Sequence, residues 1–286
     1  MFGNHPIGIY EKAFEPHISW QQRFERAAGL GFDYIEISID ETDARLSRLN
    51  WSKKQKKELL DASWNSGISI RSMCLSAHRR FPFGSKNAEI RKNAFTIMEK
   101  AIDFAADLGI RIIQLAGYDV YYEDSTEESV HRFEEGIKWA ADKAASKQVM
   151  LAMEIMDTPF MNSISKHLIY ERKINSPWYR VYPDLGNLSA WSENNSEEEI
   201  NKGIGSIVAI HLKDTIPPTE HSPGQFKSVP FGAGCVDFTA RFGQLEKLNY
   251  QGPYMIEMWY KDGTDDVSEI SRALNWLSSQ YERRIL

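Results

Sequence analysis

The sequence predicts an α/β protein folded as a (β/α)8 TIM barrel, with residues 1–286 forming a single domain. Apolar runs of strand length alternate about eight times with segments of helical periodicity. The runs are continuously apolar, which is typical of parallel strands covered by helices. A chain of 286 residues falls within the usual range for such a barrel. An open, doubly wound sheet is the alternative, although no glycine-rich phosphate loop follows the first run.

The predicted strands are short apolar runs, and four of them carry an acidic residue or a histidine at or within two residues of their C-terminal end. They are residues 7–10, 34–39, 68–75, 110–116, 149–156, 179–184, 207–211 and 254–259. The active sites of parallel barrels lie at the C-terminal ends of the strands. We therefore expect the functional side chains at these ends.

The predicted helices have apolar residues three or four positions apart, with capping residues at several of their ends. Ser125 and Glu128 form a predicted capping box, and Gly67 and Gly109 end two helices. A long loop rich in proline and glycine follows residue 211 and runs through Gly234. The helices are residues 19–28, 52–66, 87–108, 125–147, 165–174, a segment that begins at 196, 236–248 and 265–280.

Composition and charge limit the cellular setting and the partners. The net charge of −6 provides no general basic surface, so we expect no nucleic acid partner. No run approaches the roughly 20 apolar residues of a membrane span, and the first residues lack a secretory leader pattern. Two cysteines, Cys74 and Cys235, fit a reducing compartment. We therefore expect a cytoplasmic protein without a membrane partner, and an exposed helix face or the long loops could support a homodimer.

Four residues that can bind metal end consecutive strands five to eight: Glu154, Asp184, His211 and Glu257. A carboxylate in an apolar run costs several kcal/mol unless it is paired or metal-bound. Taken singly, each residue also has a structural explanation as a helix cap, an ion pair or a hydrogen-bonded core residue. Together they predict a site for one divalent ion of the Mn²⁺, Mg²⁺, Co²⁺ or Zn²⁺ kind, since oxygen donors dominate.

Several segments resemble a known superfamily. Similarity to the xylose-isomerase-like barrels, which are sugar isomerases and epimerases, is carried by residues 152–154, 182–187, 210–214, 229–238 and 254–257. Closer similarity to the bacterial L-ribulose-5-phosphate (L-xylulose-5-phosphate) 3-epimerases of L-ascorbate and L-xylulose catabolism is carried by residues 72–82, 114–119 and 254–259. The resemblance covers essentially the whole chain.

This resemblance implies metal ligation by Glu154, Asp184, His211 and Glu257, with Glu154 and Glu257 also acting as acid and base. Inversion at C3 of a 2-ketose removes a proton from one face of the carbon and returns one to the other, so two groups must flank it. A divalent ion chelated by O2 and O3 would stabilise the cis-enediolate by several kcal/mol. The sequence does not assign either glutamate to a face.

Two residues expected near the sugar differ from those of the free-ketose 3-epimerases. Asn187 stands where those enzymes commonly have histidine, and Phe160 stands where they have an acidic residue. A phosphate on C5 could supply the missing binding energy through charge-assisted hydrogen bonds. We predict that it is held by the loop with His78, Arg79, Arg80, Ser85 and Lys86, or by the competing loop with Lys213, His221 and Lys227.

Two further polar residues lie in predicted strands. Gln114 is predicted to reach a sugar hydroxyl, with a satisfied buried amide as the alternative. Glu36 is expected to bond the substrate or a metal ligand, or to form an internal ion pair. Asn187 and Lys213 complete the predicted substrate contacts, and aromatic walls are expected from Phe81, Phe83, Trp191 and Trp259.

The sequence leaves four other functions open. An aldose–ketose isomerase and a free-ketose 3-epimerase would use the same ligands. An endonuclease acting at abasic sites is disfavoured by the acidic charge and the seven scattered histidines. A non-catalytic sugar-phosphate-binding protein would not need two carboxylates flanking a carbon.

Overall fold

The structure is a computed structural model that describes residues 2–284. Within this part of the chain, eight parallel strands pair in the order β6-β5-β4-β3-β2-β1-β10-β7. The bridges Val181–Ile207 and Asp184–His211 join β6 to β7 and close the sheet. The predicted barrel is confirmed. Its strands are β1 (Ile7–Tyr10), β2 (Tyr34–Ile39), β3 (Ser69–Leu75), β4 (Ile112–Leu115), β5 (Met150–Glu154), β6 (Tyr179–Tyr182), β7 (Ile210–Leu212) and β10 (Tyr254–Ile256).

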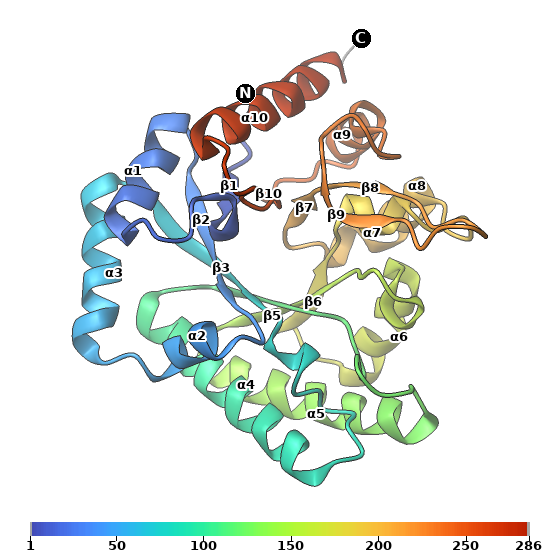
Figure 1. Ribbon diagram of the computed structural model, residues 1–286. Helices are drawn as coiled ribbons and strands as arrows, with labels where there is room; N and C mark the ends of the chain where they lie inside the picture. Colours follow the sequence, from blue (N-terminus) through green and yellow to red (C-terminus); the bar gives the residue numbers. More distant parts are fainter. Residues whose placement is uncertain (1, 285–286) are drawn as a thin grey trace.

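The helices form a ring around the strands (Figure 1). The longer ones each follow a strand and cover its outer face. No helix between residues 2 and 284 is long and apolar enough to cross a membrane. The α-helices are α1 (Trp20–Leu30), α2 (Asp43–Leu46), α3 (Lys53–Ser66), α4 (Ala88–Leu108), α5 (Glu127–Ser146), α6 (Ile164–Ile174), α7 (Leu185–Ser189), α8 (Ser196–Gly203), α9 (Phe238–Lys247) and α10 (Asp266–Arg283).

Capping residues explain where the helices begin and end. Asn87 caps α4 through its side chain, and Gly109 ends it at φ 71°, a conformation that glycine adopts without strain. The capping box of α5 uses Thr126 and Ser129. The prediction of Ser125 with Glu128 was wrong by one residue, because Ser125 donates instead to Asp119 at 2.6 Å.

The segment after β7 contains an antiparallel hairpin that the sequence did not predict. Its strands are β8 (Asp214–Ile216) and β9 (Gln225–Val229). Asp214 fixes the return of the chain, because its Oδ2 atom accepts 2.9 Å hydrogen bonds from the backbone of Gly232 and Gly234. The hairpin projects from the barrel beside α7 (Figure 1).

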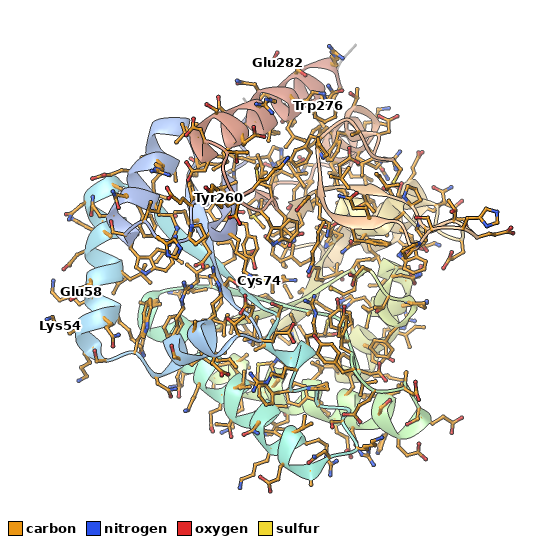
Figure 2. All side chains as sticks on the ribbon, in the orientation of Figure 1. Lys54, Glu58, Cys74, Tyr260, Trp276 and Glu282 are labelled. Carbon is orange, nitrogen blue, oxygen red and sulfur yellow. The ribbon has the colours of Figure 1, made fainter. Side chains whose placement is uncertain are left out.

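Two apolar layers stabilise the barrel. The main core lies between the strands and the surrounding helices. A smaller cluster fills the barrel interior with Tyr10, Tyr34, Cys74, Ala152, Tyr182, Ala209 and Met255. Cys74 lies toward the centre, whereas Lys54 and Glu58 point outward from α3 (Figure 2). The interior layer forms the floor beneath the C-terminal ends of the strands.

Candidate active site

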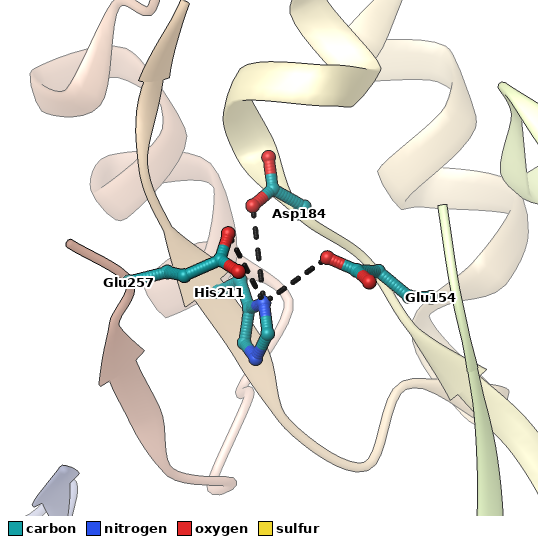
Figure 3. Close-up of side chains that lie close together, drawn as sticks. All are labelled: Glu154, Asp184, His211 and Glu257. Atoms are coloured by element: carbon teal, nitrogen blue, oxygen red, sulfur yellow. Dashed lines mark ion pairs between the residues drawn. The ribbon is translucent and has the colours of Figure 1, made fainter. Parts of the chain in front are cut away.

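The four predicted ligands meet at the C-terminal mouth of the barrel. Glu154 ends β5, Asp184 caps α7 directly after β6, His211 lies in β7 and Glu257 follows β10. One ligand atom from each residue lies within 4.8 Å of the others. Figure 3 shows the three carboxylates directed at Nδ1 of His211, at 3.3 Å from Glu154, 3.9 Å from Asp184 and 3.8 Å from Glu257.

The atoms that face this point are buried and make no hydrogen bond, although the two carboxylate oxygens lie at ion-pair distance from the ammonium of Lys213. Among the described residues, this holds for Nδ1 of His211, Oδ2 of Asp184 and Oε2 of Glu257. Buried polar atoms normally have partners, because leaving one unpaired costs about 1–3 kcal/mol. Three oxygen donors and one nitrogen donor fit a divalent cation, which would satisfy these atoms together.

The remaining atoms of these ligands are fixed by neighbours. Oδ1 of Asp184 accepts from the backbone of Asn187 at 2.7 Å, which leaves Oδ2 directed at the cluster. Gln114 donates to Glu154 from β4. Nε2 of His211 lies 3.1 Å from Glu36. The ligand side chains are therefore held in place by β4, β2 and the first turn of α7.

The ammonium of Lys213 lies beside the ligands, 3.2 Å from Asp184 and 3.1 Å from Glu257. Burial raises the pKa of Glu154, and it raises the pKa of Asp184 to about 7. Burial also acts to raise the pKa of Glu257, but Lys213 and His211 outweigh it, so this pKa is lowered. Three carboxyl groups therefore surround one ammonium group, an arrangement that favours the binding of a cation.

A cavity opens above the ligands. Glu154, Glu257, Asn187 and Lys213 contribute to its lining, as predicted for residues at the mouth. The rest of the lining is mostly polar and charged, with aromatic side chains from Tyr10 and Trp259 and apolar ones from Ala116 and Met156. Besides Lys213, the charged lining residues beyond the ligand set are Lys12, Asp40, Glu41, Arg79, Asp157 and Lys227.

The predicted phosphate loop lies mostly outside this cavity. His78 is buried, stacks on Phe83 and contacts the backbone oxygen of Ala94 at 3.2 Å. Arg80 is exposed and pairs with Asp43 at 2.8 Å. Ser85 donates to Glu123, and the backbone of Lys86 donates to the same carboxylate at 2.9 Å. In the part of the chain that the structure describes, the lining of the mouth cavity includes none of His78, Arg80, Ser85 and Lys86. This geometry does not support a substrate role for them.

Gln114 lies beneath Glu154 and is fully buried. Its amide group contacts the carboxylate of Glu154, and within residues 2–284 its Oε1 atom has no partner. Gln114 is absent from the cavity lining of the described chain. The contact fits a role in orienting Glu154 better than direct contact with a sugar.

Sequence reasoning gave no site role to Lys12, Asp157 or Asp40, and it named Arg79 only as a member of its loop. Arg79 lines the cavity and lies 4.7 Å from the ring centroid of Tyr121. The neighbouring Arg80 pairs with Asp43 instead. The sequence contains no signal that shows which of the two arginines lines the cavity. Lys12 lies two residues after the end of β1, so its place close to a strand end was the available signal.

The comparisons with known proteins agree with this geometry. The sequence pattern of the family described as "Xylose isomerase-like TIM barrel" matches residues 24–280. SgbU of Haemophilus influenzae, provisionally named an L-ribulose-5-phosphate 3-epimerase, is 58% identical over 98% of this chain and 97% of its own. UlaE of Escherichia coli O157:H7, named L-ribulose-5-phosphate 3-epimerase, is 51% identical over 97% of this chain and 95% of its own.

Solved structures share the fold at low sequence identity. D-allulose 3-epimerase from Methylomonas sp. in complex with D-allulose has a TM-score of 0.78 at 19% identity, covering 98% of this chain and 99% of that one. A barrel protein from Mycobacterium smegmatis in complex with magnesium has a TM-score of 0.71 at 15% identity, covering 99% and 100%. Because the family pattern and the relatives extend over nearly the whole chain, this protein belongs to the xylose isomerase-like TIM barrel family.

Proposed function

We propose that this protein is a metal-dependent 3-epimerase that interconverts L-xylulose 5-phosphate and L-ribulose 5-phosphate in L-ascorbate and L-xylulose catabolism. The observation that carries the proposal is the buried set of Glu154, Asp184, His211 and Glu257, whose potential ligand atoms converge at the mouth of the barrel. The names of relatives that are 51–58% identical supply the substrate. The resemblance of the sequence motifs points to the same activity.

In this proposal the two glutamates work on opposite faces of C3. Glu154 comes from β5 and Glu257 from the end of β10, and His211 of β7 lies between them in Figure 3. One carboxylate removes the proton α to the carbonyl and the other returns a proton to the opposite face. A bound divalent ion would polarise the substrate oxygens and stabilise the negative charge that develops on them.

Neighbouring side chains would orient these groups. Gln114 holds one oxygen of Glu154, which directs the other oxygen to the mouth. Lys213 holds Glu257 and Asp184 in place and places a positive charge beside the reacting carbon. Trp259 covers one side of the cavity and limits the access of water to the substrate.

We further propose that the substrate phosphate lies between Arg79 and Lys227. Both residues line the cavity. In the described chain Lys227 has no carboxylate within ion-pair distance and lies 5.8 Å from the ring centroid of Trp259, while Arg79 is 3.7 Å from Glu41. Burial lowers the pKa of Lys227, and the positive charge of Arg79 lowers it further. An anion between these cations would relieve that repulsion.

The proposal is tested by comparing L-ribulose 5-phosphate with free L-ribulose as substrates. Wild-type protein should convert the phosphate ester to L-xylulose 5-phosphate, lose activity with a chelator and regain it with a divalent ion. The Lys227→Met variant should raise KM for the phosphate ester about tenfold or more, since a charge-assisted contact is lost. Its KM for free L-ribulose should stay unchanged. Equal conversion of both substrates by wild type would contradict the phosphate assignment.

A further inference from the structure

Glu36 is a buried carboxylate that does not touch the cavity. It lies in the middle of β2, and its exposed fraction is 0%. Its Oε1 atom is 3.1 Å from Nε2 of His211. Its other oxygen accepts from the hydroxyl of Tyr182 at 3.3 Å. Among residues 2–284, no lysine or arginine lies within ion-pair distance of Glu36, so an internal ion pair with such a residue does not explain its charge.

The two nitrogens of His211 face different partners. Nδ1 faces Glu154, Asp184 and Glu257 at the mouth, whereas Nε2 faces Glu36 in the barrel interior. A neutral imidazole has one nitrogen that donates a proton and one that carries a lone pair. A carboxylate opposite Nε2 keeps the proton there, which leaves the lone pair of Nδ1 directed at the cluster.

A neutral acceptor could also hold the proton on Nε2 of His211. The negative charge of Glu36 adds a second effect, which acts on the affinity of the site for a cation. Four carboxylates, those of Glu36 and the three ligand residues, lie around His211, and Lys213 is the one ammonium paired with them in the described chain. Uncompensated charge in a buried site is costly. A divalent cation at the mouth would offset most of this excess, so a fourth carboxylate strengthens the attraction for it.

We propose that Glu36 is a positioning residue that fixes His211 as an Nδ1 ligand and thereby sets the affinity of the site for a divalent cation. This inference rests on the metal-dependent function proposed above. Tyr182 belongs to the same arrangement, since its hydroxyl holds the second oxygen of Glu36. Partners of this kind typically change metal affinity by about 10–100-fold.

The test is the dissociation constant for Mn²⁺, measured on chelator-treated full-length protein by the signal of free Mn²⁺ in electron paramagnetic resonance. The variant Glu36→Gln keeps the size of the side chain and removes its charge. Its dissociation constant should rise about 10–100-fold. The control Glu199→Gln changes another buried carboxylate, which holds Ser165 at 2.6 Å outside the barrel, and should bind Mn²⁺ like wild type.

A second variant and a stability readout separate positioning from a structural role. Tyr182→Phe removes one hydrogen bond to Glu36 and should weaken Mn²⁺ binding about fivefold, which also covers the case in which Glu36→Gln does not fold. Metal-free Glu36→Gln should melt within a few degrees of Glu199→Gln. A lower melting temperature of metal-free Glu36→Gln, together with an unchanged dissociation constant for Mn²⁺, would overturn the inference.

The Mn²⁺ titrations distinguish a failure of the proposed role of Glu36 from a failure of the proposed metal-dependent function. Tight Mn²⁺ binding by wild type with equally tight binding by Glu36→Gln would overturn the role of Glu36 and leave the metal-dependent function standing. Failure of wild type to bind Mn²⁺ or any other divalent ion would overturn both. Weaker binding by Glu36→Gln and Tyr182→Phe, with an unchanged Glu199→Gln, supports both.

Discussion

Glu154 is an anionic side chain at the end of an otherwise apolar strand, and its partners explain why the barrel tolerates it. Gln114 and His211 contact its two oxygens. The convergence of the four candidate ligands could be predicted because strand ends can be located in the sequence, and parallel strands end on one face. The direction of loop side chains could not be predicted. Arg79 and Arg80 are adjacent in sequence, yet Arg79 alone of the two lines the cavity of the described chain.

The two glutamates should be indispensable for turnover. Glu154→Gln and Glu257→Gln each keep an oxygen that can face a metal but cannot carry the proton. Each variant should lose about 10²–10⁴-fold in kcat, the usual contribution of general acid–base catalysis, while substrate binding is partly retained. Steady-state kinetics and calorimetric titration with L-ribulose 5-phosphate measure the two effects. The exposed variant Asp61→Asn on α3 serves as the control. Near-normal epimerisation by either glutamine variant would rule out the two-glutamate mechanism.

His78 should make stability depend on pH. Burial lowers its pKa to about 4, although its contact with Ala94 acts in the opposite direction. In the unfolded chain the pKa is about 6.5, so between pH 6.5 and 4 the unfolded chain binds more protons. The contribution of neutral His78 to the free energy of unfolding is therefore complete above pH 6.5 and decreases as the pH falls toward 4. Between pH 7 and pH 5 the loss should be about 2 kcal/mol.

Urea denaturation of wild type and His78→Gln at pH 7 and pH 5 checks this expectation. The variant should lose less stability than wild type over this interval. Some dependence should remain, because burial also lowers the pKa of His167. The same loss in both proteins would show that His78 does not titrate in this window.

At the scale of elements, the regular helices were predictable and the hairpin β8–β9 was not. Capping residues and apolar spacing mark α4 and α10 within a few residues. Strand β9 is largely exposed and polar, so no apolar pattern separates it from a loop. The hairpin is nevertheless functional in the proposal, because it carries Lys227 to the cavity.

The short helix α7 positions Asp184, and Gly186 lets it pack closely. A Cβ atom at this position would lie 2.7 Å from the backbone oxygen of Lys213 and would also meet Thr215. The helix must therefore shift in Gly186→Ala. We expect a loss of about 1–3 kcal/mol in the free energy of unfolding and weaker Mn²⁺ binding, because Asp184 is the N-cap of this helix.

The matched control for this substitution is Gly205→Ala, where an added Cβ meets no described atom within 4 Å. Urea denaturation and Mn²⁺ titration of both variants provide the measurement. If Gly186→Ala matches Gly205→Ala in both experiments, close packing of α7 does not position Asp184.

For the whole molecule, the position of the site relative to the closure of the barrel is the main feature. The bridge Asp184–His211 is one of the two isolated β-bridges that join the β6 and β7 segments in the described chain. Two ligands therefore lie on the closing contact itself. The alternating strands and helices of the sequence predicted the barrel. How few residues pair between β6 and β7 depends on the pairing register, which apolar runs do not encode. The expected homodimer and cytoplasmic location remain predictions.

A cation at this closure should stabilise the folded protein. A ligand at 100 times its dissociation constant adds about 2.7 kcal/mol to the free energy of unfolding. For a chain of 286 residues, we expect Mn²⁺ at that concentration to raise the melting temperature by roughly 4–5 °C. Calorimetric scans of chelator-treated protein with and without Mn²⁺ measure this shift. An unchanged melting temperature would argue against metal binding at the closure.

The most direct test of the proposed chemistry is proton NMR of L-ribulose 5-phosphate in D₂O with the metal-loaded protein. Removal and return of a proton at C3 predict that deuterium replaces the C3 proton while L-xylulose 5-phosphate accumulates. Exchange at C1 would instead show aldose–ketose isomerisation. Either that result or the absence of exchange at C3 would contradict the proposed 3-epimerase.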